Sequence, residues 1–183
     1  MYRLLIAEDE QSTRRWFERK IRWDEIGFEI CAIADDGAQA WDRLQEEPAV
    51  DALLTDIRMP GMDGLELCRL ANTLAARPEI VILSGYGDFE YAKRAIEYGV
   101  SRYLLKPVAA EQLEDVFRSL KAKLDEEARR KEALRLADLW RRKAEMEDRA
   151  ARFRAWFEGR LSPEETKSAL REAESLRPAP PYR

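Results

Sequence analysis

The chain has 183 residues, of which 45% are hydrophobic and 37% are charged. This length suits one domain of ordinary size with an appendage, and the apolar fraction is enough for a sizeable core. The sequence contains no histidine, which excludes Ser-His-Asp and Cys-His catalytic pairs, imidazole-dependent zinc sites and a phosphohistidine on this chain. No apolar run approaches the ~18 residues that span a bilayer, and the N-terminus lacks signal-peptide features, so we expect a cytoplasmic protein that does not contact a membrane.

Charge is unevenly distributed along the chain. Residues 1–107 carry 14 basic and 20 acidic side chains, whereas residues 108–183 carry 18 and 16. Neither part has the one-sided basic clustering of a nucleic-acid surface. Cys31 and Cys68 lie in apolar segments outside any CxxC pattern. We therefore expect two reduced thiols, buried or half-buried, rather than a disulfide or a metal site.

The first part of the chain alternates short apolar runs with helical patterns, which is typical of parallel strands joined by crossover helices. The strands are expected at residues 3–7, 28–34, 51–56, 79–83 and 102–105. The helices between them are expected at residues 10–21, 38–45, 65–74 and 88–98, and a fifth begins at Ala110. Asp88 is the expected N-cap of the fourth helix, and Gly99 is its expected end. Strict alternation of five strands with five helices predicts an α/β, doubly wound fold with a five-stranded parallel sheet.

A C-terminal long helical extension is predicted over residues 110–158, which contain neither proline nor glycine. Its apolar stripe is interrupted by a polar stretch and resumes at Leu134. Because the heptad is broken, we expect no regular leucine zipper, but a long helix that pairs with a second chain. Gly159 should end this helix. Ser162 and Pro163 then indicate a short helix start within residues 159–183, which finish in a Pro-rich tail.

Polar side chains stand where the predicted strands end. In doubly wound folds, ligands bind outside the carboxyl ends of the strands. The residues at these ends are Glu8 and Asp9 after the first strand, Asp56 at the third, Ser84 after the fourth and Lys106 after the fifth. Crowded carboxylates repel one another unless a cation joins them, and hard oxygen ligands select Mg²⁺. The pattern therefore predicts a magnesium site at this edge of the sheet.

This set of residues, in this order, resembles the receiver domain of two-component response regulators, which has a flavodoxin/CheY-like fold. The segments TDIRMPGMDGLEL and SGYGDFEYAKRAIEYGVSRYLLKP strengthen the resemblance, which covers residues 1–122. It implies that Asp56 is the phosphoacceptor and that Asp9 binds Mg²⁺ directly. Glu8, which replaces the commoner Asp but keeps its charge, would bind the metal through water. The backbone carbonyl of Arg58 would be the remaining protein ligand.

The resemblance also implies how the phosphoryl group is bound and sensed. Lys106 would pair with one phosphoryl oxygen, and Ser84 would donate a hydrogen bond to another. Tyr103 is the expected switch residue that changes rotamer as Ser84 moves. Gly64 is interpreted as a turn requirement rather than as part of a phosphate cradle. Arg58 and Tyr86 are expected to shield the phosphoryl group from water, because both can project over the crevice; the alternative is that Tyr86 points away and packs on the fourth helix.

Partners follow from the same resemblance. A sensor histidine kinase would supply the phosphoryl group, and a homodimer would form through the long helix, or through the face made by the fourth helix, fifth strand and fifth helix. The segment IRWDEIGFEI and residues 85–105 resemble a subgroup in which an AraC-type DNA-binding domain follows the helical segment. The chain stops where that domain would begin, so DNA contact is expected only through a missing domain. A stand-alone receiver is the alternative.

Other classes of function are less compatible with the sequence. A haloacid-dehalogenase-type phosphatase needs a second Asp two residues after its nucleophile, and Arg58 occupies that position. A nucleotide-binding module would carry a glycine-rich loop after the first strand, where acids stand instead. A purely structural coiled coil would leave the acidic crevice unexplained. We therefore expect no enzyme in the ordinary sense, but a phosphoacceptor with intrinsic self-phosphorylation and autodephosphorylation chemistry.

Overall fold

The computed structural model describes residues 1–46, 50–85, 89–160, 164 and 167. It divides into two compact units, Met1–Asp125 and Glu126–Arg183. The first unit contains a five-stranded parallel sheet in the order β2-β1-β3-β4-β5. The strands are β1 (Tyr2–Ala7), β2 (Phe28–Ala34), β3 (Ala52–Asp56), β4 (Glu79–Ser84) and β5 (Arg102–Leu105). The predicted strands agree with these bounds to within one residue, and the doubly wound α/β fold is confirmed.

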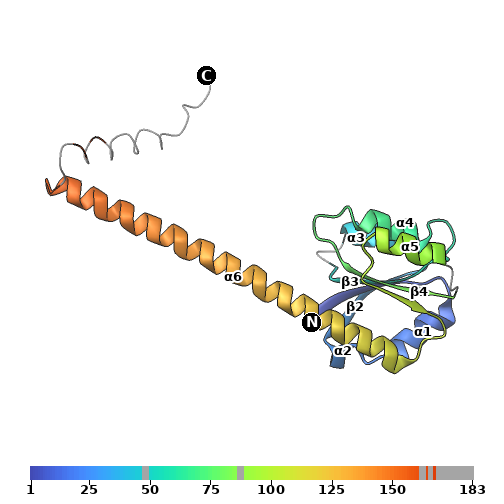
Figure 1. Cartoon of the computed structure of the whole chain (residues 1–183). Helices are drawn as coiled ribbons and strands as arrows, with labels where there is room; N and C mark the ends of the chain where they lie inside the picture. The colour runs from blue at the N-terminus through green and yellow to red at the C-terminus, as the bar shows by residue number, and fades with distance from the viewer. Residues whose placement is uncertain (47–49, 86–88, 161–163, 165–166, 168–183) are drawn as a thin grey trace, which may run out of the picture. The chain divides into compact units, whose positions relative to one another are not determined.

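Helices cover both faces of the sheet (Figure 1). One face carries α3 (Gly37–Glu46), α4 (Gly64–Ala71) and α5 (Phe89–Glu97), and the other carries α1 (Gln11–Lys20), α2 (Trp23–Ile26) and the beginning of α6 (Ala110–Phe157). The third predicted helix ends earlier than expected, because the chain leaves α4 through a turn in which the Leu74 amide bonds to the carbonyl of Ala71. The expected cap Asp88, the expected shield Tyr86 and the Ser162–Pro163 helix start lie outside the described residues.

The short helix α2 corrects the expected strict alternation of strands and helices. It has only four residues, too few to show a helical period in the sequence. Trp23 and Ile26 are nevertheless buried, and the Trp23 indole donates a hydrogen bond to the carbonyl of Phe17 over 3.0 Å. Gly27 ends the helix in the left-handed region at φ 91°. A glycine adopts this conformation without the steric cost that other residues meet.

Two apolar clusters, one on each face of the sheet, form the core of the first unit. The cluster under α1, α2 and α6 is centred on Phe117, whose ring meets Trp23 at 4.8 Å and Phe28 at 5.1 Å, both edge to face. The cluster under α3, α4 and α5 includes Cys68, where burial raises the pKa of the thiol to about 12. Both cysteines are free, as expected.

Helix α6 agrees with the predicted long helix. It ends at Gly159, which has φ 68° and whose amide bonds to the carbonyl of Trp156. At its other end, Glu114 is buried and accepts hydrogen bonds from Arg118 at 2.8 Å and from Arg22 at 3.5 Å. These contacts fix the first turns of α6 against the sheet. Among the described residues, no helix combines the length and the apolar character that a membrane crossing requires.

Candidate functional site

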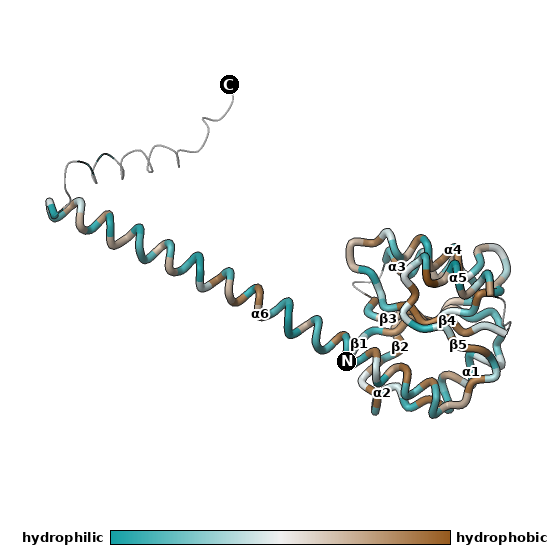
Figure 2. The backbone as a smooth tube through the Cα atoms, viewed as in Figure 1, coloured by the Kyte–Doolittle hydropathy of each residue, from teal (hydrophilic) through white to brown (hydrophobic). Residues whose placement is uncertain are grey.

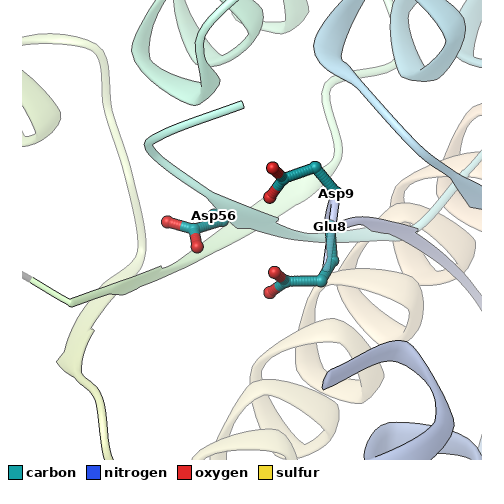
Figure 3. A group of neighbouring side chains, drawn as sticks. All are labelled: Glu8, Asp9 and Asp56. Atoms are coloured by element: carbon teal, nitrogen blue, oxygen red, sulfur yellow. The ribbon is translucent and has the colours of Figure 1, made fainter. Parts of the chain in front are cut away.

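The acidic residues of the site lie at the point where the strand order reverses. β1 pairs with β2 on one side and with β3 on the other, so the ends of β1 and β3 border the crevice typical of this fold. Glu8 and Asp9 follow β1, and Asp56 ends β3. One carboxylate oxygen from each of the three lies within 4.8 Å of the others. Figure 3 shows the carboxylates of Glu8 and Asp9 extending toward the side on which Asp56 lies.

Lys106, which directly follows the edge strand β5, also belongs to this cluster. Its backbone amide continues the β4–β5 pairing by donating to the carbonyl of Ser84 over 2.7 Å. Its ammonium lies 2.8 Å from Glu8 Oε2 and 2.5 Å from Asp56 Oδ2. The structure therefore brings together side chains from three strand ends that are far apart in the sequence, at the edge where the sequence predicted them.

Burial and the oppositely charged neighbours act in opposite directions on the pKa of Glu8 and on the pKa of Lys106. The Glu8 side chain is only 2% exposed, and this burial raises the pKa of Glu8 while the hydrogen bond from Lys106 acts in the opposite direction. Burial also lowers the pKa of Lys106, but the hydrogen bonds to Asp56 and Glu8 outweigh it and leave that pKa above its ordinary value. Lys106 therefore keeps its positive charge at neutral pH and offsets part of the negative charge of the cluster.

Local backbone contacts hold the Asp56 carboxylate in place. Oδ1 accepts hydrogen bonds from the amides of Ile57 at 2.5 Å and Arg58 at 3.2 Å. Next to it, the Thr55 hydroxyl donates to the Asp56 carbonyl over 2.8 Å. These contacts fix one carboxylate oxygen, while the other, Oδ2, faces Lys106.

The requirement for glycine at Gly64 has a different cause from the expected turn. Gly64 is the first residue of α4, and its amide bonds to the Ile57 carbonyl over 2.8 Å. A Cβ atom at this position would lie only 1.9 Å from the carbonyl oxygen of Asp56. Close approach of the helix to the end of β3, rather than a positive φ, therefore requires the glycine.

The acidic cluster fits a magnesium ion. Two oxygen ligands on opposite sides of Mg²⁺ are about 4 Å apart, so oxygens within 4.8 Å of one another need only a small movement to share one ion. Asp9 is exposed and the Asp56 side chain is 14% exposed, which leaves room for the water ligands that Mg²⁺ keeps. Glu8, Asp9 and Asp56 would hold the ion, together with the peptide of Arg58 beside them.

The two expected switch residues lie on neighbouring strands. Ser84 ends β4 and is 1% exposed, and it is paired in register with Leu105 of β5. Tyr103 is half-buried on β5 and packs against the cluster under α3, α4 and α5. In the β4–β5 register, Tyr103 therefore lies two positions before the residue that pairs with Ser84.

Arg14 positions the acidic loop, and the sequence interpretation missed it. From α1, its guanidinium donates to the carbonyls of Glu8 at 2.6 Å and Asp9 at 2.9 Å, and it lies 3.1 Å from the Asp35 carboxylate. Arginine on an exposed helical face is common, so only the three-dimensional proximity of α1 to the end of β1 identifies this role.

A pocket of about 370 Å³ opens beside Lys106, between α1 and the segment that joins β5 to α6. Its lining is mainly apolar and is made by Ser12, Thr13, Trp16, Phe17, Leu83, Lys106, Pro107 and Val108. The pocket adjoins the charged cluster through Lys106 alone among these residues. An apolar surface thus flanks the carboxylates on the α1 side.

Comparisons with known proteins place this site in a family. The family model described as the response regulator receiver domain matches residues 4–118. The chain is 37% identical over 126 residues to the uncharacterized transcriptional regulatory protein YesN of Bacillus subtilis, covering 66% of this chain and 34% of that protein. It is 37% identical over 114 residues to the transcriptional regulatory protein HptR of Staphylococcus aureus, covering 62% and 44%.

Solved structures agree with the sequence relatives. The receiver domain of AraT, a response regulator from Geobacillus stearothermophilus, superposes with a TM-score of 0.64 at 37% identity, covering 69% of this chain and 98% of that one. A two-component transcriptional regulator AraC from Clostridium phytofermentans gives 0.60 at 35% identity, covering 67% and 94%. The chain spans between a third and a half of the length of the curated relatives it matches. By its matched residues and its fold, the chain belongs to the response regulator receiver-domain family of two-component systems.

Proposed function

We propose that this protein is a cytoplasmic response regulator in which Asp56 accepts a phosphoryl group from a sensor histidine kinase. The observation that carries the proposal is the contact of the Asp56 carboxylate with Lys106 inside a cluster of three acids. A strand-end acid with a merely structural role does not need an ammonium group and two further carboxylates around it. The family membership supports the same chemistry.

In the proposed reaction, a carboxylate oxygen of Asp56 attacks the phosphorus of the phosphodonor. The bond from phosphorus to the donor's imidazole nitrogen breaks, and the imidazole takes up a proton from water. Mg²⁺ bound by the acids would neutralise charge on the phosphoryl oxygens. Lys106 already lies against Asp56 and is positioned to contact a phosphoryl oxygen once the group is attached. The amides of Ile57 and Arg58 keep the carboxylate oriented throughout.

Magnesium dependence tests this proposal. Incubation with acetyl phosphate and Mg²⁺ should add one phosphoryl group, detected by intact mass, and a chelator should slow the addition by at least about tenfold, since this corresponds to only ~1.4 kcal/mol of barrier. The three carboxylates otherwise repel the incoming group. Excess Mg²⁺ added after the chelator should restore the rate. Equal labelling rates with and without the metal would contradict the proposed role of the acidic cluster.

The pocket beside Lys106 supports a helical kinase segment as the docking partner. Trp16, Phe17 and Val108 offer apolar contact area on the α1 side of the acids. A partner seated there would have its phosphohistidine close to Asp56, because Lys106 borders both the pocket and the carboxylate. The chain itself contains no histidine, so the donor must be another protein or a small molecule.

Phosphorylation would be read out through the face made by α5, β5 and α6. Ser84 and Tyr103 lie beside this face, and α6 continues from it. We infer that the phosphoryl group draws the Ser84 hydroxyl toward it and shifts a pre-existing equilibrium by a few kcal/mol. The active state would dimerise through this face, through α6, or through both.

Replacing Ser84 with Ala tests the switch separately from the chemistry. The variant should accept phosphate at a rate within about threefold of wild type, because the hydroxyl contributes only one hydrogen bond. Its phosphorylation-induced dimerisation, followed by sedimentation velocity, should nevertheless weaken. Thr73→Ala, which removes an exposed hydroxyl after α4 and outside the proposed dimer face, is the control and should behave as wild type. A Ser84→Ala chain that dimerises on phosphorylation as strongly as wild type would contradict this coupling route.

The output proposed for the whole protein is control of transcription. Relatives with the same first segment are named as transcriptional regulators. In this proposal residues 1–122 accept the phosphoryl group from the kinase, and residues 110–158 transmit the signal. Residues 159–183 would connect to a DNA-binding domain outside this chain. The protein would then contact DNA only through that domain.

A further inference from the structure

The second unit exposes a series of large apolar side chains on α6. Leu136, Leu139, Met146, Phe153 and Phe157 are between 45% and 81% exposed. In Figure 2, apolar positions recur among hydrophilic ones along this helix. Contiguous exposed apolar surface marks an interaction site more often than isolated apolar residues do.

These side chains follow an unbroken heptad. The seven residues Leu136, Leu139, Lys143, Met146, Ala150, Phe153 and Phe157 recur at alternating steps of three and four, and we call them the seam. They occupy successive a and d positions of three heptads, the pattern by which two helices pack side by side. The stripe expected from the sequence is interrupted by a polar stretch and resumes at Leu134, on a different face of the helix. The seam begins at Leu136 and does not include that interruption.

The seam is separate from the stripe that α6 buries in the first unit. Leu113, Phe117 and Leu120 are buried there. When the alternating three- and four-residue spacing of these buried side chains is continued along α6, most of the positions that it reaches are charged. They are Glu127, Lys131, Leu134, Asp138 and Arg141. The seam therefore does not compete with the packing of α6 on its own sheet.

We propose that the seam pairs with the seam of a second copy of this chain in a parallel, in-register, two-stranded coiled coil. This proposal deepens the dimerisation proposed above, by naming its surface and its orientation. An identical helix is the natural occupant, because each a or d side chain then packs between side chains of the same kind.

The charges beside the seam select the parallel orientation. Arg135, Arg142 and Arg149 occupy the g positions, and the e positions hold Trp140, Glu147 and Arg154. In a parallel pair, Arg142 faces Glu147 of the second copy on both sides of the interface, whereas Arg149 meets a like charge at Arg154. In an antiparallel pair the arginine column of the g positions faces itself, and Glu147 no longer faces an arginine of that column. One attractive contact per side therefore opposes one repulsion in the first arrangement, whereas the second has the repulsion between arginines without that attractive contact.

Lys143 makes the pairing weak and specific in register. It occupies an a position, is 64% exposed, and lies 3.9 Å from Glu147 on its own helix. In a parallel dimer the two Lys143 side chains approach each other, and a polar residue at a fixes register at a cost in stability. Pairing of the receivers would raise the local concentration of the two seams, so a weak seam is one that phosphorylation can control.

Cysteine crosslinking of the full chain, with and without acetyl phosphate and Mg²⁺, tests the orientation. Leu139→Cys should form a disulfide-linked dimer at least about tenfold faster than Leu134→Cys, an exposed position off the seam, because the paired seams hold the two thiols at high effective concentration. The wild-type chain shows the background from Cys31 and Cys68. Equal rates for the two variants, or fast crosslinking only when Leu139→Cys is mixed with Phe157→Cys, the a position that would lie opposite it in an antiparallel pair, would overturn the parallel seam.

The affinity test uses a matched pair of charge substitutions. Leu139→Glu should weaken the dimer, measured by sedimentation equilibrium, by at least about tenfold, and Leu134→Glu by less than about twofold, because only the former places a charge between the helices. A wild-type chain that stays monomeric with and without acetyl phosphate would also overturn the proposal. Labelling of Asp56 should be the same in both variants. Failure of the wild-type chain and of both variants to label would therefore count against the proposed chemistry, whereas normal labelling with a dimer that Leu139→Glu does not weaken would count against the seam.

Discussion

Replacing Asp56 with Asn should abolish the addition of a phosphoryl group from acetyl phosphate and leave the chain folded. A carboxamide of the same shape can still accept the amides of Ile57 and Arg58 through its oxygen, so the loop after β3 keeps its contacts. The amide has no negative charge with which to attack phosphorus. It also contributes no charge to the contact with Lys106 or to a metal ion. The loss should therefore be complete rather than partial.

Intact mass after incubation with acetyl phosphate and Mg²⁺ measures this loss. The matched control is Asp42→Asn, the same substitution on an exposed residue of α3, and it should label as wild type does. Peptide mapping of the labelled wild-type chain should place the group on Asp56. Labelling of Asp56→Asn at the wild-type rate would contradict the proposal that Asp56 is the phosphoacceptor. Labelling of another acid of the cluster in the wild-type chain would assign that role to the other acid.

The sequence predicted those parts of the fold and site that follow from apolar runs along the chain and from the residues at the ends of the strands. The apolar runs of β1, β3 and β4 are largely buried on both faces, so their limits are visible as changes in polarity. In a parallel sheet the residues after each strand meet at one edge. The positions of Glu8, Asp56 and Lys106 at that edge therefore followed from topology alone.

The parts that the sequence did not predict depend on contacts between distant elements. Helix α2 is barely one helical turn long, so no repeated apolar spacing marks it in the sequence, although Trp23 and Ile26 are buried. Arg14 acts on the acidic loop through carbonyl groups, which every residue has and no sequence pattern marks. The seam was not predicted, because the exposed apolar residues of α6 lie on two faces of the helix. A pattern that starts from Leu134 includes residues from both faces.

The second prediction concerns Gly64, where the beginning of α4 closely approaches the end of β3. Replacing Gly64 with Ala should lower the free energy of unfolding by about 3 kcal/mol, at the upper end of the usual cost of overpacking. The added Cβ would lie 1.9 Å from the Asp56 carbonyl oxygen and 3.0 Å from the Thr55 hydroxyl oxygen. β3 cannot yield easily, because it is paired with β1 on one side and β4 on the other.

Gly85→Ala provides the matched control for this substitution, because a Cβ there meets no atom of the described residues within 4 Å and the backbone is outside the left-handed region. Urea denaturation should show a lower midpoint for Gly64→Ala and little change for Gly85→Ala. The folded fraction of Gly64→Ala should also label more slowly with acetyl phosphate, since a shift of α4 displaces the Ile57 and Asp56 carbonyls to which it is fitted. A variant as stable as wild type would show that the start of α4 is free to move, and that the glycine serves neither the packing nor the placement of Asp56.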